Sequence, residues 1–566
     1  MEQTVNILID LTEPSNQELK ITLDWKPNVK SFEFSLPIWT PGSYKVRDHV
    51  QYLYKLHLSQ GEKTIETKRT ATNMWNANLT TLERIKLSYT IEARNLTVRT
   101  CYLDPDFASL CLSGAILLIE DQRTSRYNIS LNLPSNWRVS LPLKKDGSNF
   151  IANNYDDLVD APLTAGDFTE EIFYTLNNLH KILKIGSPPR GWPREFLNDV
   201  KLICESACRI WNQDPPSGNE YVFIIQMLDK AYGGLEHDNS SVIQFDWRTL
   251  YDSSGYRKLL QLIGHEYFHQ WNIRRLRPIE YTSYNYNKIV MSESLWFAEG
   301  VTSYYDLAIP MIAGITSEND FLFDLSRELT VVLDTPGRYF QSIADSSRES
   351  WVKFYNSSLA SKATQINYYR FGTILSLCLD IRLRQHDSSL SQLLRSLWDK
   401  FGRSQKGYSR EDIKQEISYI NKKLSEELDV WLDVPNSLPI ISAIDSIGLT
   451  LIQSCSDKVT TGLLIHLENK AFCIKRVDSN SPASRSGLVV NDEIIACDDF
   501  RLESIEDLNH IAQQKSKLKI SFFRRGILKN TILIPESSKE NRWELVFNKN
   551  QDEKCKELRK NWLKIV

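Results

Sequence analysis

The sequence predicts a multidomain α+β protein: an N-terminal antiparallel β-sandwich, a central domain with a mixed sheet and a helical lobe, and a C-terminal β-rich domain. Three observations lead to this prediction. The 566 residues exceed what one hydrophobic core supports. Short strand-like segments fill the first part, and helical periodicity dominates the middle before strands return. We expect domains at 1–168, 169–440 and 441–540, and a charged helical tail at 541–566.

Composition narrows the functional class. Charged residues are 25% and hydrophobic residues 42% of the chain, which is typical of a globular protein. The net charge of −3 and the lack of a Lys/Arg block do not favour nucleic-acid binding. No apolar run approaches a membrane span, no signal peptide is visible, and nine cysteines without CxxC pairs favour reduced thiols. We expect a soluble cytoplasmic protein without nucleic-acid or membrane partners.

The first 168 residues contain eight short segments that alternate as strands do. They are VNILIDL (5–11), LKITLDW (19–25), FEFSLPIW (32–39), YKLHLS (54–59), IKLSYTIEA (85–93), LTVRTCYL (96–103), AILLIE (115–120) and YNISLNL (127–133). Turn signals separate them, which is typical of an antiparallel sandwich. The segment from Trp39 to Tyr44 contains Pro and Gly and is expected to be a tight turn whose aromatic side chains pack.

The central region changes period. FLNDVKLICESACRIWNQ (196–213) is helical, and YVFIIQML (221–228) and SSVIQF (240–245) are expected strands joined through a Gly-Gly loop. Helical periodicity then continues almost without interruption. The expected helices are 255–275, 292–308, 317–334, 366–386, 388–401, 409–421 and 423–432.

The first of these helices carries an HExxH motif, His265-Glu266-Tyr267-Phe268-His269. Histidines four residues apart project from one face, so both imidazoles can bind one metal ion, and Glu266 can take a proton from a water on that ion. A third ligand is required, and Glu299 follows after 29 intervening residues in an aromatic helical segment. Because an unpaired buried carboxylate is costly, a cation is the better explanation for Glu299. Two nitrogen ligands and one oxygen ligand suit zinc best, so we expect one zinc ion per chain, with another divalent ion as the alternative.

The chain resembles the M61 peptidases, the glycyl aminopeptidase family of zinc metallopeptidases. The matching segments are GHEYFHQWNIRRLRP (264–278), LWFAEGVTSYYD (295–306), GGLEH (233–237), LPIWTPGSYKVRD (36–48) and LTVRTCYLD (96–104). The resemblance implies a thermolysin-like catalytic domain on which the N-terminal domain packs, and a preference for glycine or alanine as the first residue of the substrate.

The resemblance also bears on substrate binding. Paired glycines, Gly233 and Gly234, let a substrate backbone approach closely. GGLEH occupies the place of the M1 aminopeptidase GAMEN motif, which implies that Glu236 binds the substrate α-ammonium group. For His237, three interpretations stay open: a residue that holds a site residue in position through a hydrogen bond, part of the wall of the site, or a structural histidine.

The segment 367–372, NYYRFG, resembles the YxKG segment in which related aminopeptidases place a tyrosine that stabilises the transition state. Counting back from Gly372 selects Tyr369. Phe371 stands where the lysine is usual, so Tyr368 remains an alternative.

Residues 461–526 resemble a PDZ domain, with SPA at 481–483, SGL at 486–488 and NDEII at 491–495. The corresponding carboxylate-binding loop is formed by Gly462, Leu463, Leu464 and Ile465. Such a loop binds a peptide C-terminus while the adjacent strand edge pairs with the peptide. A purely structural role for this domain is the alternative.

Together these features predict a zinc-dependent aminopeptidase that hydrolyses N-terminal residues from peptides, with Glu266 as general base. Two alternatives remain. One is a metallo-endopeptidase of the same fold, in which Glu236 binds no terminus. The other is a PDZ-based adaptor with an inactive protease scaffold, which the presence of all four of His265, Glu266, His269 and Glu299 disfavours.

Overall fold

The computed structural model describes residues 4–252, 254–358, 361–468, 471–502, 504–548 and 551–564. The chain forms two compact units. The first consists of Met1–Ser317, Ser388–Tyr419 and Lys564–Val566, and the second of Glu318–Asp387 and Ile420–Leu563. Among the described residues, no helix has both the length and the apolar character that a membrane crossing requires.

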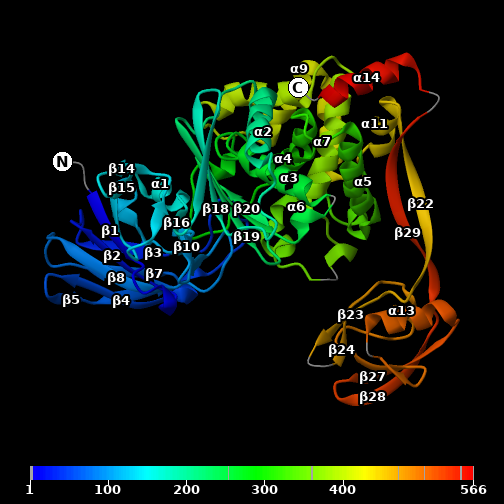
Figure 1. The fold of residues 1–566 in the computed structure, drawn as a ribbon, viewed down its shortest axis with the longest axis horizontal. Coiled ribbons are helices and arrows are strands. Elements are labelled where there is room, and N and C mark those ends of the chain that lie inside the picture. Colours follow the sequence, from blue (N-terminus) through cyan, green and yellow to red (C-terminus); the bar gives the residue numbers. More distant parts are fainter. Residues whose placement is uncertain are drawn as a thin grey trace. The chain divides into compact units, whose positions relative to one another are not determined.

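The first unit begins with a β-rich domain built from three sheets (Figure 1). The largest has the order β14-β15-β12-β1-β2-β8-β4-β5, and the others have the orders β13-β16-β10-β9 and β11-β3-β7-β6. One apolar core includes residues of all three sheets, among them Ile21, Phe34 and Leu163. The strands are β1 (Thr4–Asp10), β2 (Glu18–Trp25), β3 (Ser31–Ser35), β4 (Leu53–Gln60), β5 (Lys63–Ile65), β6 (Thr67–Ala71), β7 (Met74–Asn78), β8 (Ile85–Glu92), β9 (Cys101–Leu103), β10 (Phe107–Leu110), β11 (Leu118–Ile119), β12 (Arg126–Asn132), β13 (Arg138–Ser140), β14 (Lys144–Asp146), β15 (Asn149–Ala152) and β16 (Leu163–Gly166).

Two details of this domain differ from the sequence-based expectation. β1 and β12 pair in parallel, so the largest sheet is not purely antiparallel; pairing between strands so distant in the chain leaves no trace in local alternation. The expected strands at 96–103 and 115–120 shorten to β9 and β11. Val98, Ile116 and Leu117 are buried although they lie outside the strands, so their apolar side chains produced a strand-like pattern in the sequence.

The central part of the first unit contains the predicted mixed sheet, in the order β17-β18-β19-β21-β20. β18, β19 and β21 are parallel, whereas β17 and β20 are antiparallel to their neighbours. The segment predicted as a Gly-Gly loop is itself the strand β20, at the edge of this sheet. The strands are β17 (Thr169–Thr175), β18 (Asn178–Ile185), β19 (Glu220–Leu228), β20 (Tyr232–Glu236) and β21 (Ser240–Asp246).

The first unit also contains helices, of which α3 carries the metal-binding motif. They are α1 (Tyr155–Asp160), α2 (Phe196–Trp211), α3 (Gly255–Phe268), α4 (Val301–Ile312), α8 (Leu390–Leu397) and α9 (Arg410–Ile420). The predicted helix 255–275 ends at Phe268, and the chain turns through Ile273, whose φ is 85°. The predicted helix was too long because Trp271 and Leu276, which follow the helix, are also buried and extend the apolar pattern in the sequence.

The second unit contains a helical group and a small β-domain. Its helices are α5 (Glu318–Asp334), α6 (Ile343–Arg348), α7 (Tyr368–Arg384), α10 (Lys422–Asp433), α11 (Ile440–Ser446) and α14 (Glu553–Lys564). Two long strands, β22 (Leu449–Thr460) and β29 (Glu536–Phe547), pair with each other. The hydroxyls of Ser326 and Thr330 on α5 accept hydrogen bonds from backbone N–H groups of β29.

The small β-domain lies in sequence between β22 and β29 and has its own apolar core. It consists of β23 (Leu463–Glu468), β24 (Ala471–Val477), β25 (Glu493–Cys497), β26 (Phe500–Arg501), β27 (Leu518–Arg524), β28 (Ile527–Leu533), α12 (Pro482–Arg485) and α13 (Ile505–Gln514). The expected tail 541–566 begins with the end of β29, and its predicted helix is α14, where Trp562 is fully buried. The domain boundaries drawn from the sequence, and the PDZ assignment, remain predictions.

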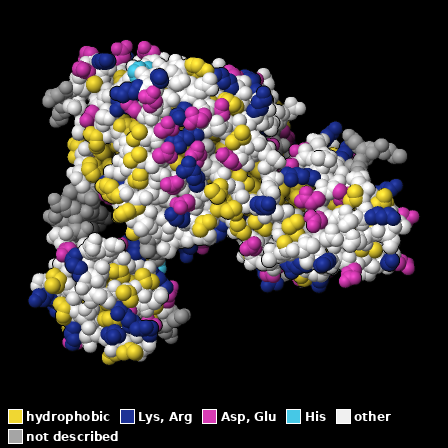
Figure 2. Space-filling view, turned by 180° about the vertical axis from the view of Figure 1, so that it is seen from behind, with side chains coloured by type: hydrophobic (Ala, Val, Ile, Leu, Met, Phe, Trp, Pro, Cys, Tyr) yellow, Lys and Arg dark blue, Asp and Glu magenta, His cyan; other side chains and the backbone are white. Residues whose placement is uncertain are grey.

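The surface carries charges of both signs. On the face shown in Figure 2, Lys and Arg side chains are interspersed with Asp and Glu side chains. This distribution agrees with the net charge of −3.

Candidate metal and peptide site

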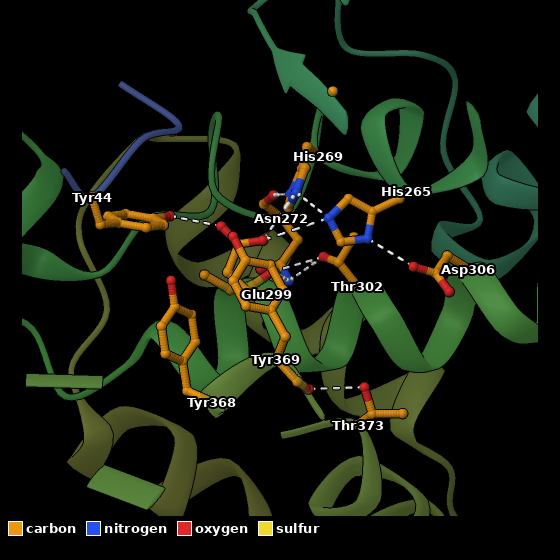
Figure 3. A network of polar contacts seen from close by, with 12 residues as sticks. Tyr44, His265, His269, Asn272, Glu299, Thr302, Asp306, Tyr368, Tyr369 and Thr373 are labelled. Carbon is orange, nitrogen blue, oxygen red and sulfur yellow. Dashed lines mark hydrogen bonds and ion pairs between the residues drawn. The ribbon is translucent and has the colours of Figure 1, made fainter. Parts of the chain in front are cut away.

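The two histidines of the motif meet at the C-terminal end of α3. Their Nε2 atoms are 3.1 Å apart, and the rings are nearly perpendicular (Figure 3). The four-residue spacing places them on one helix face, as predicted. His269 is almost fully buried, and His265 is largely buried.

Glu299 joins them from a π-helical turn, Trp296–Gly300, which precedes α4. Its Oε2 atom lies 3.3 Å from His269 Nε2 and 3.6 Å from His265 Nε2. The side-chain amide of Asn272 donates to the carbonyls of Phe297 and Ala298, which holds this turn. The predicted helix 292–308 therefore begins later and with a wider turn. π-turns of this kind are frequent at functional sites.

Each histidine is oriented through its other ring nitrogen. His265 Nδ1 is 2.8 Å from Asp306 Oδ2, and His269 Nδ1 is 2.9 Å from the carbonyl oxygen of Asn272. Because both acceptors are oxygens, Nδ1 carries the proton and each Nε2 presents its lone pair to the site. The sequence interpretation missed Asp306, although it lies seven residues, or two helical turns, after Glu299.

These residues fit a metal ion. The two Nε2 atoms and the Glu299 carboxylate lie within 4.8 Å of one another. Lone pairs that face each other at 3.1 Å repel unless a proton or a cation lies between them. A buried set of two imidazole nitrogens and one carboxylate is the ligand set of catalytic zinc sites.

Burial and charge set the protonation of the site. Burial raises the pKa of Glu299, but the imidazoles of His269 and His265 outweigh it and hold this pKa well below its ordinary value. Burial lowers the pKa of His265, but the hydrogen bonds with Asp306 and Glu299 outweigh it and raise the pKa well above the ordinary value. The carboxylate and the imidazoles thus stabilise each other's charged forms, which is a cation-binding environment.

Glu266 has the opposite character. Burial raises the pKa of its carboxyl group to about 7, against the opposing effect of His265 and His269. Its Oε2 atom is buried and accepts no hydrogen bond from the described residues. Gly234 on β20 packs directly against it: a Cβ on Gly234 would lie 2.1 Å from Glu266 Oε1. A carboxyl group whose pKa is near 7 can both accept and donate a proton at neutral pH.

The edge strand β20 also brings Glu236 to the site. One carboxylate oxygen of Glu236, one of Glu266 and a ring nitrogen of His269 lie within 4.8 Å of one another. Glu236 is only 4% exposed, and its Oε1 atom has no hydrogen-bond partner among the described residues. Gly233 and Gly234 precede it in the strand. The structure therefore brings together the predicted residues of the peptide-binding strand and those of the metal site.

His237 directly follows this strand in the chain. Its Nδ1 atom is 3.3 Å from Asp160 Oδ1, and Arg274 donates to Asp160 and to Asp238 at 2.7 Å. Burial raises the pKa of Asp160, but Arg274 and His237 outweigh it and lower this pKa. These contacts make His237 part of a buried network with Asp160 and Arg274, and the choice among its three interpretations stays a prediction.

The N-terminal domain supplies three contacts that sequence patterns did not reveal. The hydroxyl of Tyr44 donates to Glu299 Oε1 at 2.8 Å (Figure 3). Gly42, at φ +80°, lies against the Glu236 carboxylate, where a Cβ would be 2.5 Å from Oε2. Arg99 Nη2 donates to the carbonyl of Gly234 at 2.9 Å. The turn 39–44, expected to serve packing, therefore also borders the site.

Two predicted sites lie in the second unit. Tyr368 is buried at the start of α7, and the hydroxyls of Tyr368 and Tyr369 are 3.4 and 3.3 Å from that of Tyr355. Because α7 belongs to the second unit, the transition-state role of Tyr369 or Tyr368 stays a prediction.

The predicted PDZ loop forms the entry to β23, the edge strand of its sheet. Gly462, at φ +71°, packs against Ser481, and Leu463, Leu464 and Ile465 begin the strand. The N–H of Gly462 donates to the hydroxyl of Thr460 at 3.1 Å. Peptide binding by this loop stays a prediction.

Comparisons with known proteins agree with this site. The family model of the Peptidase M61 N-terminal domain matches residues 6–167, and that of M61 glycyl aminopeptidase matches residues 258–375. No curated protein sequence matches the chain. The crystal structure of an aminopeptidase N family protein from Idiomarina loihiensis has a TM-score of 0.90 at 25% identity, covering 99% of this chain and 100% of that one.

More distant structures share only the fold. Yeast LTA4 hydrolase in complex with bestatin has a TM-score of 0.50 at 14% identity, covering 79% of this chain and 70% of that one. The family matches, by contrast, cover the N-terminal domain and a segment that contains the metal ligands His265, His269 and Glu299. Residues 6–167 and 258–375 are thus identified as the two parts of an M61 peptidase, the N-terminal domain and the glycyl aminopeptidase domain.

Proposed function

We propose that this protein is a zinc-dependent aminopeptidase that releases small N-terminal residues, glycine or alanine, from peptides. The observation that carries the proposal is the convergence of a three-ligand metal site with two further carboxylates. His269, Glu266 and Glu236 lie within 4.8 Å of one another, next to the ligands His265 and Glu299. A metal site alone favours hydrolysis, and the additional carboxylate favours a substrate with a free amine.

His265, His269 and Glu299 would hold the zinc ion. When bound, zinc in such a site acts as a Lewis acid and lowers the pKa of water towards neutrality. Asp306 and the carbonyl of Asn272 keep the imidazoles in the tautomer that presents Nε2. Tyr44 holds the carboxylate of Glu299 by donating to its second oxygen.

Glu266 is the general base. Its buried carboxyl group, with a pKa of about 7, accepts the proton of the attacking water and passes it to the leaving amine. Its Oε2 atom has no partner in the described part of the chain and is available for this transfer. Gly234 makes room for this base beside the peptide-binding strand, because a Cβ there would lie 2.1 Å from Glu266 Oε1.

Glu236 makes the enzyme an exopeptidase. An extended substrate adds to the free edge of β20, and its α-ammonium group binds the carboxylate at the end of that strand. The buried, unpartnered Oε1 atom supports this role, since an ammonium donor would satisfy it. The preference for small first residues rests on the family resemblance alone.

The exopeptidase proposal is tested with a free and an N-acetylated form of one alanyl peptide. We expect hydrolysis of the free form only, and a loss of about 100-fold or more in kcat/KM for Glu236→Gln, because a buried charged contact is removed. Equal hydrolysis of the acetylated peptide would indicate an endopeptidase.

The role of the base is tested separately with Glu266→Gln. Because Glu266 is not one of the three ligands, this variant should bind one zinc ion per chain, as the unaltered protein does. Its kcat should fall by about 100- to 10,000-fold. A variant that lost metal together with activity would contradict the assignment of Glu266 as base.

The small β-domain supports a further proposal, that it binds peptide C-termini. β23 is an edge strand and Leu467 on it is exposed, which suits strand addition. Binding of C-terminal peptides to the full chain, and its loss when the peptide is amidated, tests this proposal. Equal binding of acid and amide would contradict it.

A further inference from the structure

Arg99 brings a guanidinium group to the peptide-binding strand. It lies in the turn after β8, and its Nη2 atom donates to the carbonyl oxygen of Gly234 at 2.9 Å. β20 is the last strand of its sheet, so Arg99 reaches the strand on the edge to which a substrate would add. Glu266 packs against the same glycine, so the guanidinium is a neighbour of the proposed base.

The charge of this guanidinium acts to lower the pKa of Glu266, against the larger effect of burial, but the two groups form no ion pair among the described residues. The guanidinium's Nε atom is buried without a hydrogen-bond partner, and no carboxylate within the described ranges forms an ion pair with Arg99. A single carbonyl is a poor complement for five N–H donors and a full positive charge. Partly buried cations are normally paired, and a carboxylate is the preferred bidentate partner of arginine. The missing partner is therefore an anion that comes with the substrate.

The spacing along β20 indicates which anion fits. Gly234 and Glu236 are two residues apart in one strand, which corresponds to about 7 Å. A fully extended dipeptide spans about 7 Å from its amine to its carboxylate. A dipeptide whose ammonium group binds Glu236 therefore places its carboxylate beside Arg99, with the scissile bond between them near Glu266.

We infer that Arg99 binds the C-terminal carboxylate of the substrate, and that dipeptides with a free carboxylate are the preferred substrates. This inference rests on the proposed aminopeptidase function and specifies its substrate class. Arg99 contacts the C-terminal residue of the dipeptide, which carries the leaving amine, and Glu236 contacts its N-terminal residue. In a longer peptide the guanidinium meets a neutral carbonyl, and the charge pairing is lost.

The test compares an alanyl dipeptide with its C-terminal amide, and a tripeptide with its amide, on the zinc-loaded full-length protein. We expect kcat/KM to be about 10- to 100-fold higher for the dipeptide acid than for its amide, mainly through KM, and nearly equal for the two tripeptides. Arg99→Gln should remove the difference between dipeptide acid and amide, so that the variant cleaves the two with equal kcat/KM. Arg99→Lys should retain part of the difference, since it keeps the charge but not the fork of donors.

Arg94→Gln is the matched control, because Arg94 is exposed and pairs with Glu92 at 3.4 Å on the same domain. It should leave the ratio of acid to amide unchanged. The inference is overturned if the unaltered protein cleaves the dipeptide and its amide equally, if Arg99→Gln slows both alike, or if the tripeptide acid is favoured as strongly as the dipeptide acid. Failure of the proposed function would look different: no free peptide would be cleaved, or acetylated peptides would be cleaved as well.

Discussion

Replacing Tyr44 with phenylalanine should weaken metal binding, although Tyr44 is no metal ligand. Its hydroxyl donates to Glu299 Oε1, while Glu299 Oε2 faces the two histidines. Tyr44 is 1% and Glu299 2% exposed, so water does not replace the lost donor. The variant leaves one oxygen of a buried carboxylate unsatisfied and free to turn away from the ligand position.

The magnitude follows from this geometry. A hydrogen bond to a charged group contributes about 1.5–3 kcal/mol, or about 10- to 150-fold in an equilibrium constant. Loss of a group that orients a metal ligand typically costs about 10- to 100-fold in metal affinity. Because the contact is fully buried, we expect the zinc dissociation constant of Tyr44→Phe to rise by about 10- to 100-fold.

The assay is competition between the metal-free protein and a chromogenic zinc chelator. Tyr89→Phe is the matched control: Tyr89 is 3% exposed, and its hydroxyl donates to the carbonyl of Ala115 at 3.0 Å within the same domain. That variant should lower the melting temperature without changing zinc affinity. A Tyr44→Phe protein that binds zinc within twofold of the unaltered protein would refute the proposed positioning of Glu299.

Three further predictions follow from the site. Asp306→Asn should weaken zinc binding about 10- to 100-fold in the same competition assay, because the amide no longer fixes the imidazole tautomer. Gly42→Ala should lower kcat/KM for free-amine peptides about 10-fold or more at unchanged zinc content, since the new Cβ would lie 2.5 Å from Glu236 Oε2; Gly61→Ala, also at positive φ but with open space around it, should not. In the metal-free protein the pKa of Glu266 is raised from 4.5 to about 7, so the folded state binds the proton more tightly and stability falls as pH rises between these values. Glu266→Gln should reduce that fall in urea unfolding at pH 5 and pH 8, and an identical pH dependence would contradict the raised pKa.

Local geometry made the metal ligands predictable. The spacing of His265 and His269 specifies their relation within a helix whatever surrounds it, and a catalytic zinc site requires a third ligand. Glu299 was found by that requirement together with the cost of burying a carboxylate. The π-turn that carries Glu299 was not predictable, because Asn272 stabilises it from 25 and 26 residues away in the sequence.

The strand β20 shows where propensity misleads. Two consecutive glycines favour a loop, because glycine gains little from strand pairing. Here the glycine is required by packing: Glu266 occupies the space that a side chain on Gly234 would need. The lack of side chains on Gly233 and Gly234 weakens the prediction of a strand, and it also leaves the backbone of β20 open to a substrate backbone. A functional requirement thus overrides the local preference, as is expected at sites.

Tyr44 and Arg99 could not be predicted from their surroundings, because each acts on a partner far away in the chain. Tyr44 is separated from Glu299 by 255 positions and Arg99 from Gly234 by 135. In the sequence, Tyr44 belongs to a packing turn, and Arg99 lies in a segment that alternates like a strand. The HExxH region by itself therefore predicts a metal and a hydrolytic step, but little about the substrate. Substrate choice depends on groups that the N-terminal domain adds to β20, and so removal of residues 1–168 should abolish selectivity even where the metal ligands survive.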